Sequence, residues 1–169
     1  MPFLTLLRHA KAAPPLPGQE DCDRPLTERG RTDAARMGKL LAELGLDIAL
    51  VSAAARTTET WSIASADFTA PLPPTVEQTL YLCRAAHLIE RLRAVTPDMQ
   101  SIVVVGHNPC LQEVALWLAG KTKAPGVSQM QNKFPTCALA TFELTAGSWN
   151  DLAPKTVAFT RFAAPRMLD

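Results

Sequence analysis

The stretch that decides the fold reads Ser-Ile-Val-Val-Val-Gly-His-Asn-Pro and spans residues 101–109. Its apolar run does not alternate with polar residues, which is typical of a strand buried on both faces of a parallel sheet. Asn108 and Pro109 follow as a helix cap and a proline at the first helical position. Apolar residues then recur at helical spacing up to Gly120. The stretch predicts a buried strand, a polar turn and a helix.

The same alternation of short apolar runs and helical segments extends along the rest of the chain. Strands are expected at residues 3–7, 48–51, 75–77, 136–144 and 156–162, and helices at 28–44, 54–66 and 83–95. Thr27 and Gly45 would cap the two ends of the first helix. The proline-rich residues 12–25 and the polar residues 121–135 are expected to be loops. This order predicts one domain over residues 1–169, a three-layer α/β/α sandwich with a mostly parallel central sheet.

Composition excludes several classes of partner. The chain has 17 basic and 16 acidic residues, a net charge of +1, so no overall field would hold a nucleic acid. The first residues lack the basic and apolar regions of a signal peptide, and no apolar run approaches a membrane span. We therefore expect a soluble cytoplasmic protein with no membrane partner.

Neither a metal nor a cofactor is expected. The three histidines are far apart in the chain, and no two cysteines form a Cys-x-x-Cys pair. No glycine-rich nucleotide-binding motif is present. The four dispersed cysteines are expected to be reduced and mostly buried, with a redox role for Cys110 as a remote alternative.

Four chemically capable side chains follow the ends of three expected strands. The first strand runs into Arg8 and His9, the second into Ser52 and then Arg56, and the third into His107. Because ligands of open α/β sheets bind beyond the carboxyl ends of the strands, we expect these side chains to meet at one edge.

This combination of side chains indicates phosphoryl chemistry. Guanidinium groups match phosphate oxygens with paired donors, and two arginines without a nearby aspartate favour a dianionic ligand. A neutral histidine can attack phosphorus and form a phosphohistidine intermediate. Arg8, Arg56 and His107 would then neutralise the transferring group, aided by backbone N–H groups at the helix that follows Asn108.

Several motifs resemble those of the histidine phosphatase superfamily. Residues 7–11 (Leu-Arg-His-Ala-Lys) resemble its R-H-G/A signature, and residues 23–30 resemble R-P-L-T-x-x-G. Residues 52–60 resemble S-x-x-x-R-T/A-x-x-T, residues 105–109 its second-histidine motif, and residues 134–139 a late strand entry. The chain lacks the large insertions of phosphoglycerate mutases, so it is most similar to the SixA-like branch, which is associated with phosphohistidine phosphatase activity.

The resemblance implies a phosphoglycerate mutase-like fold and a metal-independent enzyme with His9 as nucleophile. It places Arg8, Arg56 and His107 around the phosphoryl group, with Arg24 and Asn108 as further candidates for substrate binding. Arg24 could instead only pair with Asp21 or Asp23, and Lys11 could be a solvated loop residue or could steer substrate.

One departure bears on the substrate. Larger family members carry an acidic proton donor between the second arginine and the second histidine, but residues 77–86 contain only Glu77, which is expected to end a strand. An alkoxide leaving group needs a proton, whereas the imidazole of phosphohistidine leaves far more easily. The expected substrate is therefore a phosphohistidine protein. Small phosphorylated metabolites or phosphoserine, and a non-catalytic phosphate-binding module, stay open as alternatives, and a mutase is disfavoured.

Overall fold

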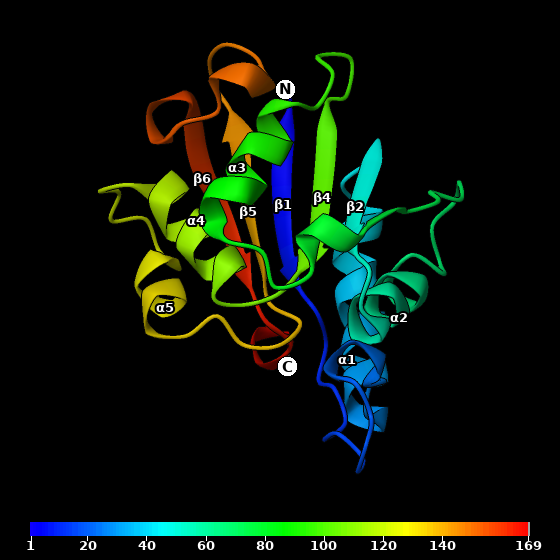
Figure 1. Cartoon of the computed structure of the whole chain (residues 1–169). Helices are drawn as coiled ribbons and strands as arrows, with labels where there is room; N and C mark the ends of the chain where they lie inside the picture. Colours follow the sequence, from blue (N-terminus) through cyan, green and yellow to red (C-terminus); the bar gives the residue numbers. More distant parts are fainter. Residues whose placement is uncertain (169) are drawn as a thin grey trace.

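The computed structural model describes residues 1–168 and contains a six-stranded sheet in the order β3-β2-β4-β1-β5-β6 (Figure 1). The strands are β1 (Phe3–Arg8), β2 (Ile48–Ser52), β3 (Thr75–Glu77), β4 (Ser101–Gly106), β5 (Leu139–Leu144) and β6 (Val157–Ala163). β1 to β4 are mutually parallel, whereas β5 runs antiparallel to both β1 and β6. The mostly parallel α/β sheet predicted from the sequence is confirmed.

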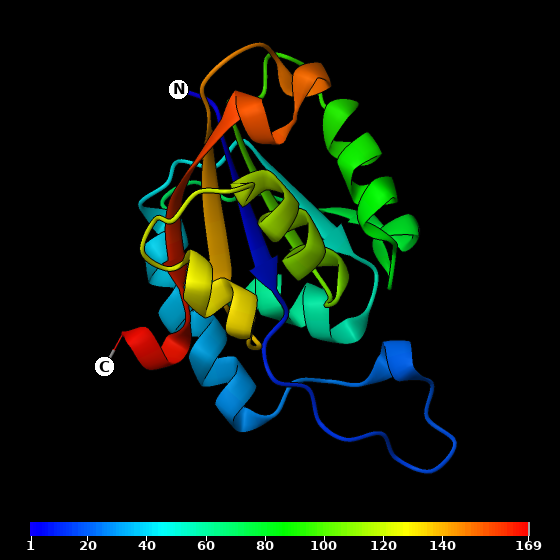
Figure 2. The ribbon, with the colours of Figure 1, turned by 90° about the vertical axis from the view of Figure 1, so that its left-hand side faces the viewer.

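Helices cover both faces of this sheet (Figures 1 and 2). They are α1 (Glu28–Ala42), α2 (Ala55–Ala64), α3 (Ala85–Arg93), α4 (Cys110–Ala119) and α5 (Val127–Asn132). Single 3-10 turns complete the chain: η1 (Asp21–Asp23), η2 (Gln78–Leu80), η3 (Trp149–Asp151), η4 (Pro154–Thr156) and η5 (Pro165–Met167). α1 and α2 pack together on one face, α3 and α4 on the other, and α5 lies against α4.

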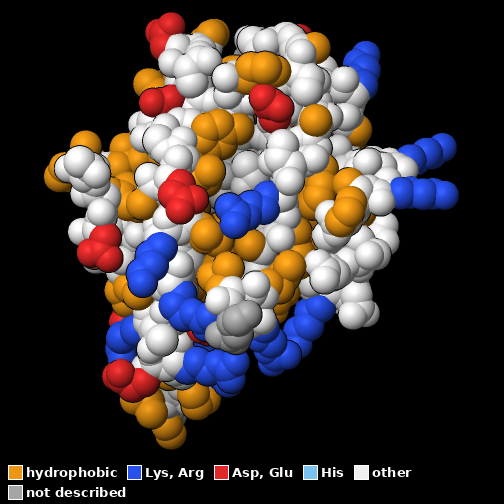
Figure 3. Space-filling view, turned by 180° about the vertical axis from the view of Figure 1, so that it is seen from behind, with side chains coloured by type: hydrophobic (Ala, Val, Ile, Leu, Met, Phe, Trp, Pro, Cys, Tyr) orange, Lys and Arg blue, Asp and Glu red, His pale blue; other side chains and the backbone are white. Residues whose placement is uncertain are grey.

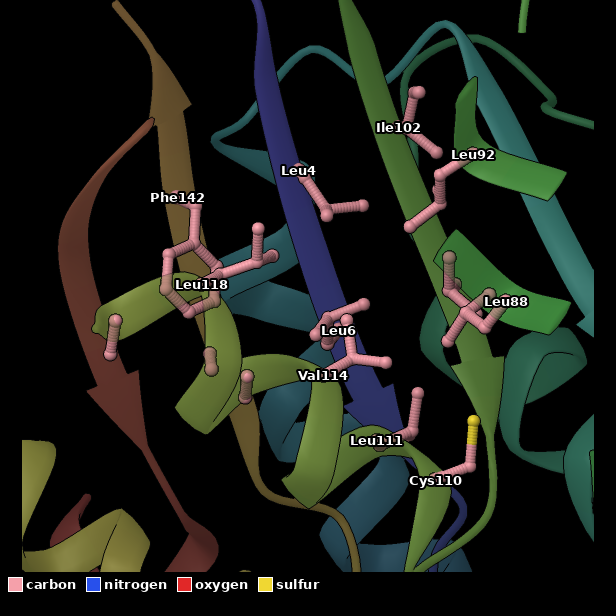
Figure 4. Packing of buried hydrophobic residues seen from close by; sticks show 14 of the residues in the cluster. Leu4, Leu6, Leu88, Leu92, Ile102, Cys110, Leu111, Val114, Leu118 and Phe142 are labelled. Atoms are coloured by element: carbon pink, nitrogen blue, oxygen red, sulfur yellow. The ribbon is translucent and has the colours of Figure 1, made fainter. Parts of the chain in front are cut away.

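The alternation of side chains along the central strands builds two apolar layers. Leu4 and Leu6 of β1 face α3 and α4 (Figure 4), whereas Leu7 faces α1 and α2. Ile102 and Val103 of β4 divide between the same two layers, and neither is exposed. Each fully buried leucine or valine stabilises the fold by about 1.5–3 kcal/mol relative to an exposed one. The two-sided burial expected of residues 101–105 is confirmed.

Helix α1 begins as its sequence predicts, because the Thr27 hydroxyl accepts a hydrogen bond from the N–H of Gly30 at 3.0 Å. Gly30 also sits against the loop that leaves β1. A Cβ at this position would lie 2.3 Å from the carbonyl oxygen of Lys11. The glycine of the R-P-L-T-x-x-G segment therefore permits α1 to approach the segment that carries the candidate nucleophile.

Several sequence expectations about element bounds are wrong. Residues 121–135 are not a continuous loop, because Val127 and Met130, three residues apart, bury one face of α5. Pro109 occupies the cap position after a cis peptide bond with Asn108, α4 starts at Cys110, and Asn108 makes no capping bond. The helices expected at 28–44, 54–66 and 83–95 are shorter, and β5 starts at Leu139. In the described part of the chain, no helix is both long enough and apolar enough to cross a membrane.

Candidate active site

The carboxyl ends of β1, β2 and β4 bring the predicted side chains to one edge of the sheet. Arg8 at the end of β1 is in register with Gly106 at the end of β4, so His9 and His107 leave neighbouring strands side by side. Their ring centroids are 5.3 Å apart, with the ring planes at 56°. The N–H of His9 donates to the carbonyl oxygen of Gly106 at 3.0 Å, which fixes this spacing. Residues that are 98 positions apart thus line one site.

The ring of His9 is held in one tautomer. Its Nδ1 lies 2.7 Å from the carbonyl oxygen of Ala10, and because a carbonyl only accepts, Nδ1 must carry the proton. Nε2 therefore keeps its lone pair. Burial is the main cause that lowers the pKa of His9 to about 4; the bond to Ala10 opposes this shift, and the positive charges of Arg56, Arg8 and Arg24 add to it. At neutral pH the ring is uncharged and can act as a nucleophile.

His107 is oriented by Ser52, the last residue of β2. Ser52 Oγ lies 2.7 Å from His107 Nε2 and both side chains are buried. The donor and acceptor of this bond depend on the tautomer of His107; we assign the serine hydroxyl as the donor, which leaves the ring proton on Nδ1. That Nδ1 is buried and has no partner among the described atoms. Burial, with the nearby His9 and Arg56, lowers the pKa of His107 to about 3, so a neutral N–H donor is available for an anion.

Arg56 lies in the first turn of α2 and is 4 % exposed. Its guanidinium donates to the carbonyl oxygen of Asp21 at 2.8 Å and to the Asp21 carboxylate at 2.9 Å. The phenol of Tyr81 donates to the same carboxylate, and its ring lies edge-on to His107 with centroids 5.5 Å apart. The expectation that no aspartate lies near the arginines is wrong, because η1 folds back over the site.

The bonds to Asp21 keep it ionised. Hydrogen bonds from Tyr81, Arg24 and Arg56 hold the pKa of its carboxyl far below the usual range. Arg24 donates to Asp21 at 2.9 Å and to the carbonyl oxygen of Ala13 at 2.8 Å, so it pairs with Asp21 and borders the site. Asp21 thus presents a negative charge to the side chains expected to bind phosphate.

Arg8 and Asn108 share an anchor at the carbonyl oxygen of Phe134. Arg8 Nη1 donates to it at 2.8 Å and Asn108 Nδ2 at 3.1 Å. Arg8 Nε is buried and, within the described chain, has no partner, so it keeps a free donor. Besides this bond to Phe134, the side-chain amide of Asn108 donates to the side-chain oxygen of Gln112 at 3.3 Å. The structure therefore places Asn108 beside His107 as a support for the 134–136 segment, and its part in substrate binding stays a prediction.

Hydroxyl groups of the 52–60 motif hold the surrounding backbone. Thr60 Oγ1 accepts from the N–H of Ala10 at 2.9 Å and donates to the carbonyl oxygen of Arg56 at 2.6 Å. It thereby connects the segment that carries His9 to the first turn of α2. Thr57 Oγ1 donates to the carbonyl oxygen of Ser52 at 2.6 Å. The small polar residues of this motif position the histidines and Arg56 relative to one another.

Glu77, the carboxylate of the 77–86 segment, is held in an ion pair. Glu77 ends β3, as expected, and forms a bidentate pair with Arg91, with the closest contact at 2.7 Å. Cys83 and Cys110 lie beside the site with their sulfur atoms 3.5 Å apart, and both are free thiols. Over residues 1–168, no three histidine, cysteine, aspartate or glutamate side chains are grouped in a way that could hold a metal ion.

Sequence reasoning missed Asp21, Tyr81 and the partnership of Ser52 with His107. For Tyr81 a signal existed, because β3 lies beside β2 and its carboxyl end must reach the same edge of the sheet. Ser52 belongs to the 52–60 motif, but the sequence does not indicate that it is hydrogen-bonded to His107. Asp21 lies in the irregular 12–25 segment, where no periodicity indicates which side chain turns inward.

Comparisons with known proteins agree with this geometry. The family described as histidine phosphatase superfamily (branch 1) matches residues 4–81. An uncharacterized protein of Mycobacterium tuberculosis is 34% identical over 164 residues, which cover 95% of this chain and all of that protein. A proposed phosphohistidine phosphatase SixA of Agrobacterium tumefaciens superposes with a TM-score of 0.82 at 28% identity, covering 98% of this chain and 99% of its own. Another proposed SixA, of Nakamurella multipartitia, gives 0.82 at 25% identity over 97% and 96% of the two chains. The chain belongs to the histidine phosphatase superfamily, branch 1.

Proposed function

We propose that this protein is a metal-independent phosphohydrolase that uses His9 as its nucleophile and removes the phosphoryl group of phosphohistidine, with a phosphorylated protein as the expected partner. The observation that carries the proposal is the bond from His9 Nδ1 to the carbonyl oxygen of Ala10. It leaves an unprotonated Nε2 beside Arg8 and Arg56, where an anionic phosphorus centre would bind.

The reaction takes two steps. Nε2 of His9 forms a bond to phosphorus while the bond from phosphorus to the leaving nitrogen breaks, and the substrate imidazole, already protonated on its other ring nitrogen, departs as a neutral ring. Water then forms the new P–O bond, the bond from phosphorus to Nε2 breaks, and inorganic phosphate leaves with the two water protons, so that His9 returns to its neutral Nδ1–H form. The guanidinium groups of Arg8 and Arg56 and the Nδ1–H of His107 would stabilise the phosphoryl oxygens in both steps.

The carboxylates near the site favour a good leaving group. Asp21 is ionised and hydrogen-bonded to Tyr81 and Arg24, and Glu77 is paired with Arg91. Neither therefore offers a proton to a departing alkoxide. A nitrogen leaving group depends less on such a donor. The likeness to the two proposed SixA proteins supports the same substrate class.

Parallel assays test the proposal. Turnover of phosphohistidine, phosphoserine and 4-nitrophenyl phosphate would be compared for the wild-type protein and His9→Ala. We expect kcat/KM for phosphohistidine to exceed that for phosphoserine by at least about 100-fold, and His9→Ala to lose on the order of 1,000-fold or more. His87→Ala is the matched control, because it removes an imidazole that is exposed on α3.

Adding small phosphorylated metabolites as substrates, and a measurement of phosphate binding, separates the alternatives. If phosphoserine or small phosphorylated metabolites were turned over faster than phosphohistidine, they would be assigned as the substrate class instead. Phosphate binding without turnover of any substrate would indicate a binding module. Full activity of His9→Ala would contradict the mechanism itself.

A further inference from the structure

A second concave site shares Arg8 with the candidate active site. This basic cavity has a volume of about 410 Å³. The charged side chains in its wall are Arg8, Lys11, Arg29, Lys133, Arg166 and Asp33. Figure 3 shows lysine and arginine side chains gathered on the lower part of the face opposite to that of Figure 1. Five basic groups and one acidic group thus meet in a molecule whose net charge is only +1.

Four separate segments supply these charges. Lys11 follows β1, Arg29 lies in the first turn of α1, Lys133 follows α5, and Arg166 belongs to η5. The segments approach one another at the end of the sheet where β1 stops, which is also where His9 lies. The clustering is a product of the fold, because no run of basic residues exists in the sequence.

Most of this positive charge has no internal counter-charge. Within residues 1–168, no carboxylate lies at ion-pair distance from Lys11, Lys133 or Arg166. Arg29 approaches Asp33, but at 3.8 Å, near the limit of an ion pair. Like charges in one concavity repel each other and raise the local potential, which attracts anions.

We propose that the basic cavity binds a second anionic group of the substrate, a carboxylate or a phosphate, while the phosphoryl group to be removed contacts His9. This inference rests on the proposed function and narrows its substrate class. Arg8 lies in the walls of both sites, so the two anions would be carried on one molecule. The volume is that of a small-molecule site, which suits one compact charged group rather than a broad protein surface.

Two sources could supply this second anion. One is a small substrate that carries a carboxylate or a second phosphate. The other is an acidic side chain next to a phosphohistidine in a protein. The chemistry of recognition is the same in both cases, so the experiment has one arm for each.

In the first arm, the substrates are phenyl phosphate, 4-carboxyphenyl phosphate and its neutral carboxamide. We expect kcat/KM to be about five-fold or more higher for the carboxylate than for the carboxamide, as one partly exposed charge contact predicts. The preference should fall as salt concentration rises. In the second arm, phosphohistidine peptides with flanking glutamates are compared with the same peptides carrying glutamines.

The variant that tests the cavity is Lys133→Gln/Arg166→Gln, since within residues 1–168 neither side chain is hydrogen-bonded to Arg8, His9, Arg56 or His107. It should abolish the preference for the charged probe while leaving turnover of phenyl phosphate within about two-fold. The matched control is Lys121→Gln/Lys155→Gln, which removes the same charge. Lys121 follows the far end of α4 and Lys155 lies in η4, and both line a different concavity. The control should retain the full preference.

The outcomes separate this inference from the proposed function. Turnover of phenyl phosphate without any preference for the carboxylate probe or the glutamate peptide, or an equal loss in the control, would overturn the basic cavity alone. If no probe is turned over, binding of the charged and neutral probes to His9→Ala is measured by calorimetry. A preference for the charged probe that Lys133→Gln/Arg166→Gln removes would support the cavity even then, and equal affinities would overturn it.

Discussion

Arg56 Nη2 lies 2.9 Å from Oδ2 of Asp21, so the buried arginine at the centre of the site contacts a carboxylate of the chain itself. A phosphoryl dianion bound to Arg56 would meet this negative charge at close range. The side chain of Asp21 is 47% exposed and lies in the short η1 turn, so a bound anion can displace it from Arg56. Asp21 therefore competes with an anionic ligand for the guanidinium group of Arg56.

Asp21→Asn should therefore increase the affinity for inorganic phosphate and vanadate. Because one like charge near the ligand is removed, we expect the inhibition constants of these anions to fall about three- to ten-fold. Asp23→Asn is the control, because Asp23 lies in the same turn without a contact to Arg56. Weaker anion binding by Asp21→Asn would instead assign Asp21 a role in holding Arg56 in place.

Ser52→Ala should lower kcat while leaving the fold intact. Loss of the 2.7 Å bond frees the His107 ring to change tautomer, so Nδ1 no longer presents its proton reliably. We expect kcat to fall about 10- to 100-fold and KM to change little. Ser65→Ala, which removes a hydroxyl that bonds the carbonyl oxygen of Trp61, should leave kcat unchanged. Equal losses in the two variants would argue against orientation of His107 by Ser52.

The two buried histidines should make the protein less stable in mild acid. The pKa of His9 is about 4 and that of His107 about 3 in the folded state, whereas an unfolded histidine has a pKa of about 6.5. Below pH 6.5 the unfolded chain binds protons that the folded site does not, so the free energy of unfolding falls as pH decreases toward 4. The loss from His9 should be on the order of 2–3 kcal/mol.

Chemical denaturation of the wild type and of His9→Gln between pH 4 and 7 checks this expectation. Glutamine cannot titrate, so the variant should show a shallower fall in the free energy of unfolding across that range. Identical slopes for the two proteins would mean that His9 binds its proton equally in the folded and unfolded states, and would contradict its lowered pKa.

Gly38→Ala should destabilise the protein without touching the site. A Cβ at this position would lie 2.3 Å from the carbonyl oxygen of Ala64, where α1 and α2 cross, and backbone cannot move aside cheaply. We expect a loss of about 2 kcal/mol or more, despite the better helix propensity of alanine. Lys39→Ala, at the next and exposed position of α1, should change the free energy of unfolding by less than about 0.5 kcal/mol. Thermal and urea denaturation would compare the two.

Sequence patterns predict the sheet and its helices because burial leaves a periodic signature. Residues 102–105 are apolar throughout, and the structure buries them on both faces. The short helix α5 was not predicted. Two buried residues, Val127 and Met130, are too few to distinguish the single-face helix α5 from a loop.

The sequence pattern predicts the direction of the parallel strands, and this direction brings together Arg8, His9, Arg56 and His107. The inward turn of Asp21 and the basic cavity do not follow from it. Both depend on how irregular segments fold back, and Lys11, Lys133 and Arg166 lie far apart in the chain with no shared period. Their proximity is set by tertiary packing alone.

The most direct test of the account is to trap the phosphorylated enzyme during turnover and locate the phosphoryl group. Protein quenched with alkali, which preserves phosphohistidine, would be digested and sequenced by mass spectrometry. The account predicts a single phosphoryl group on the imidazole of His9, absent from His9→Ala and present in His87→Ala. A phosphoryl group on another residue, or steady turnover with His9 never modified, would contradict it.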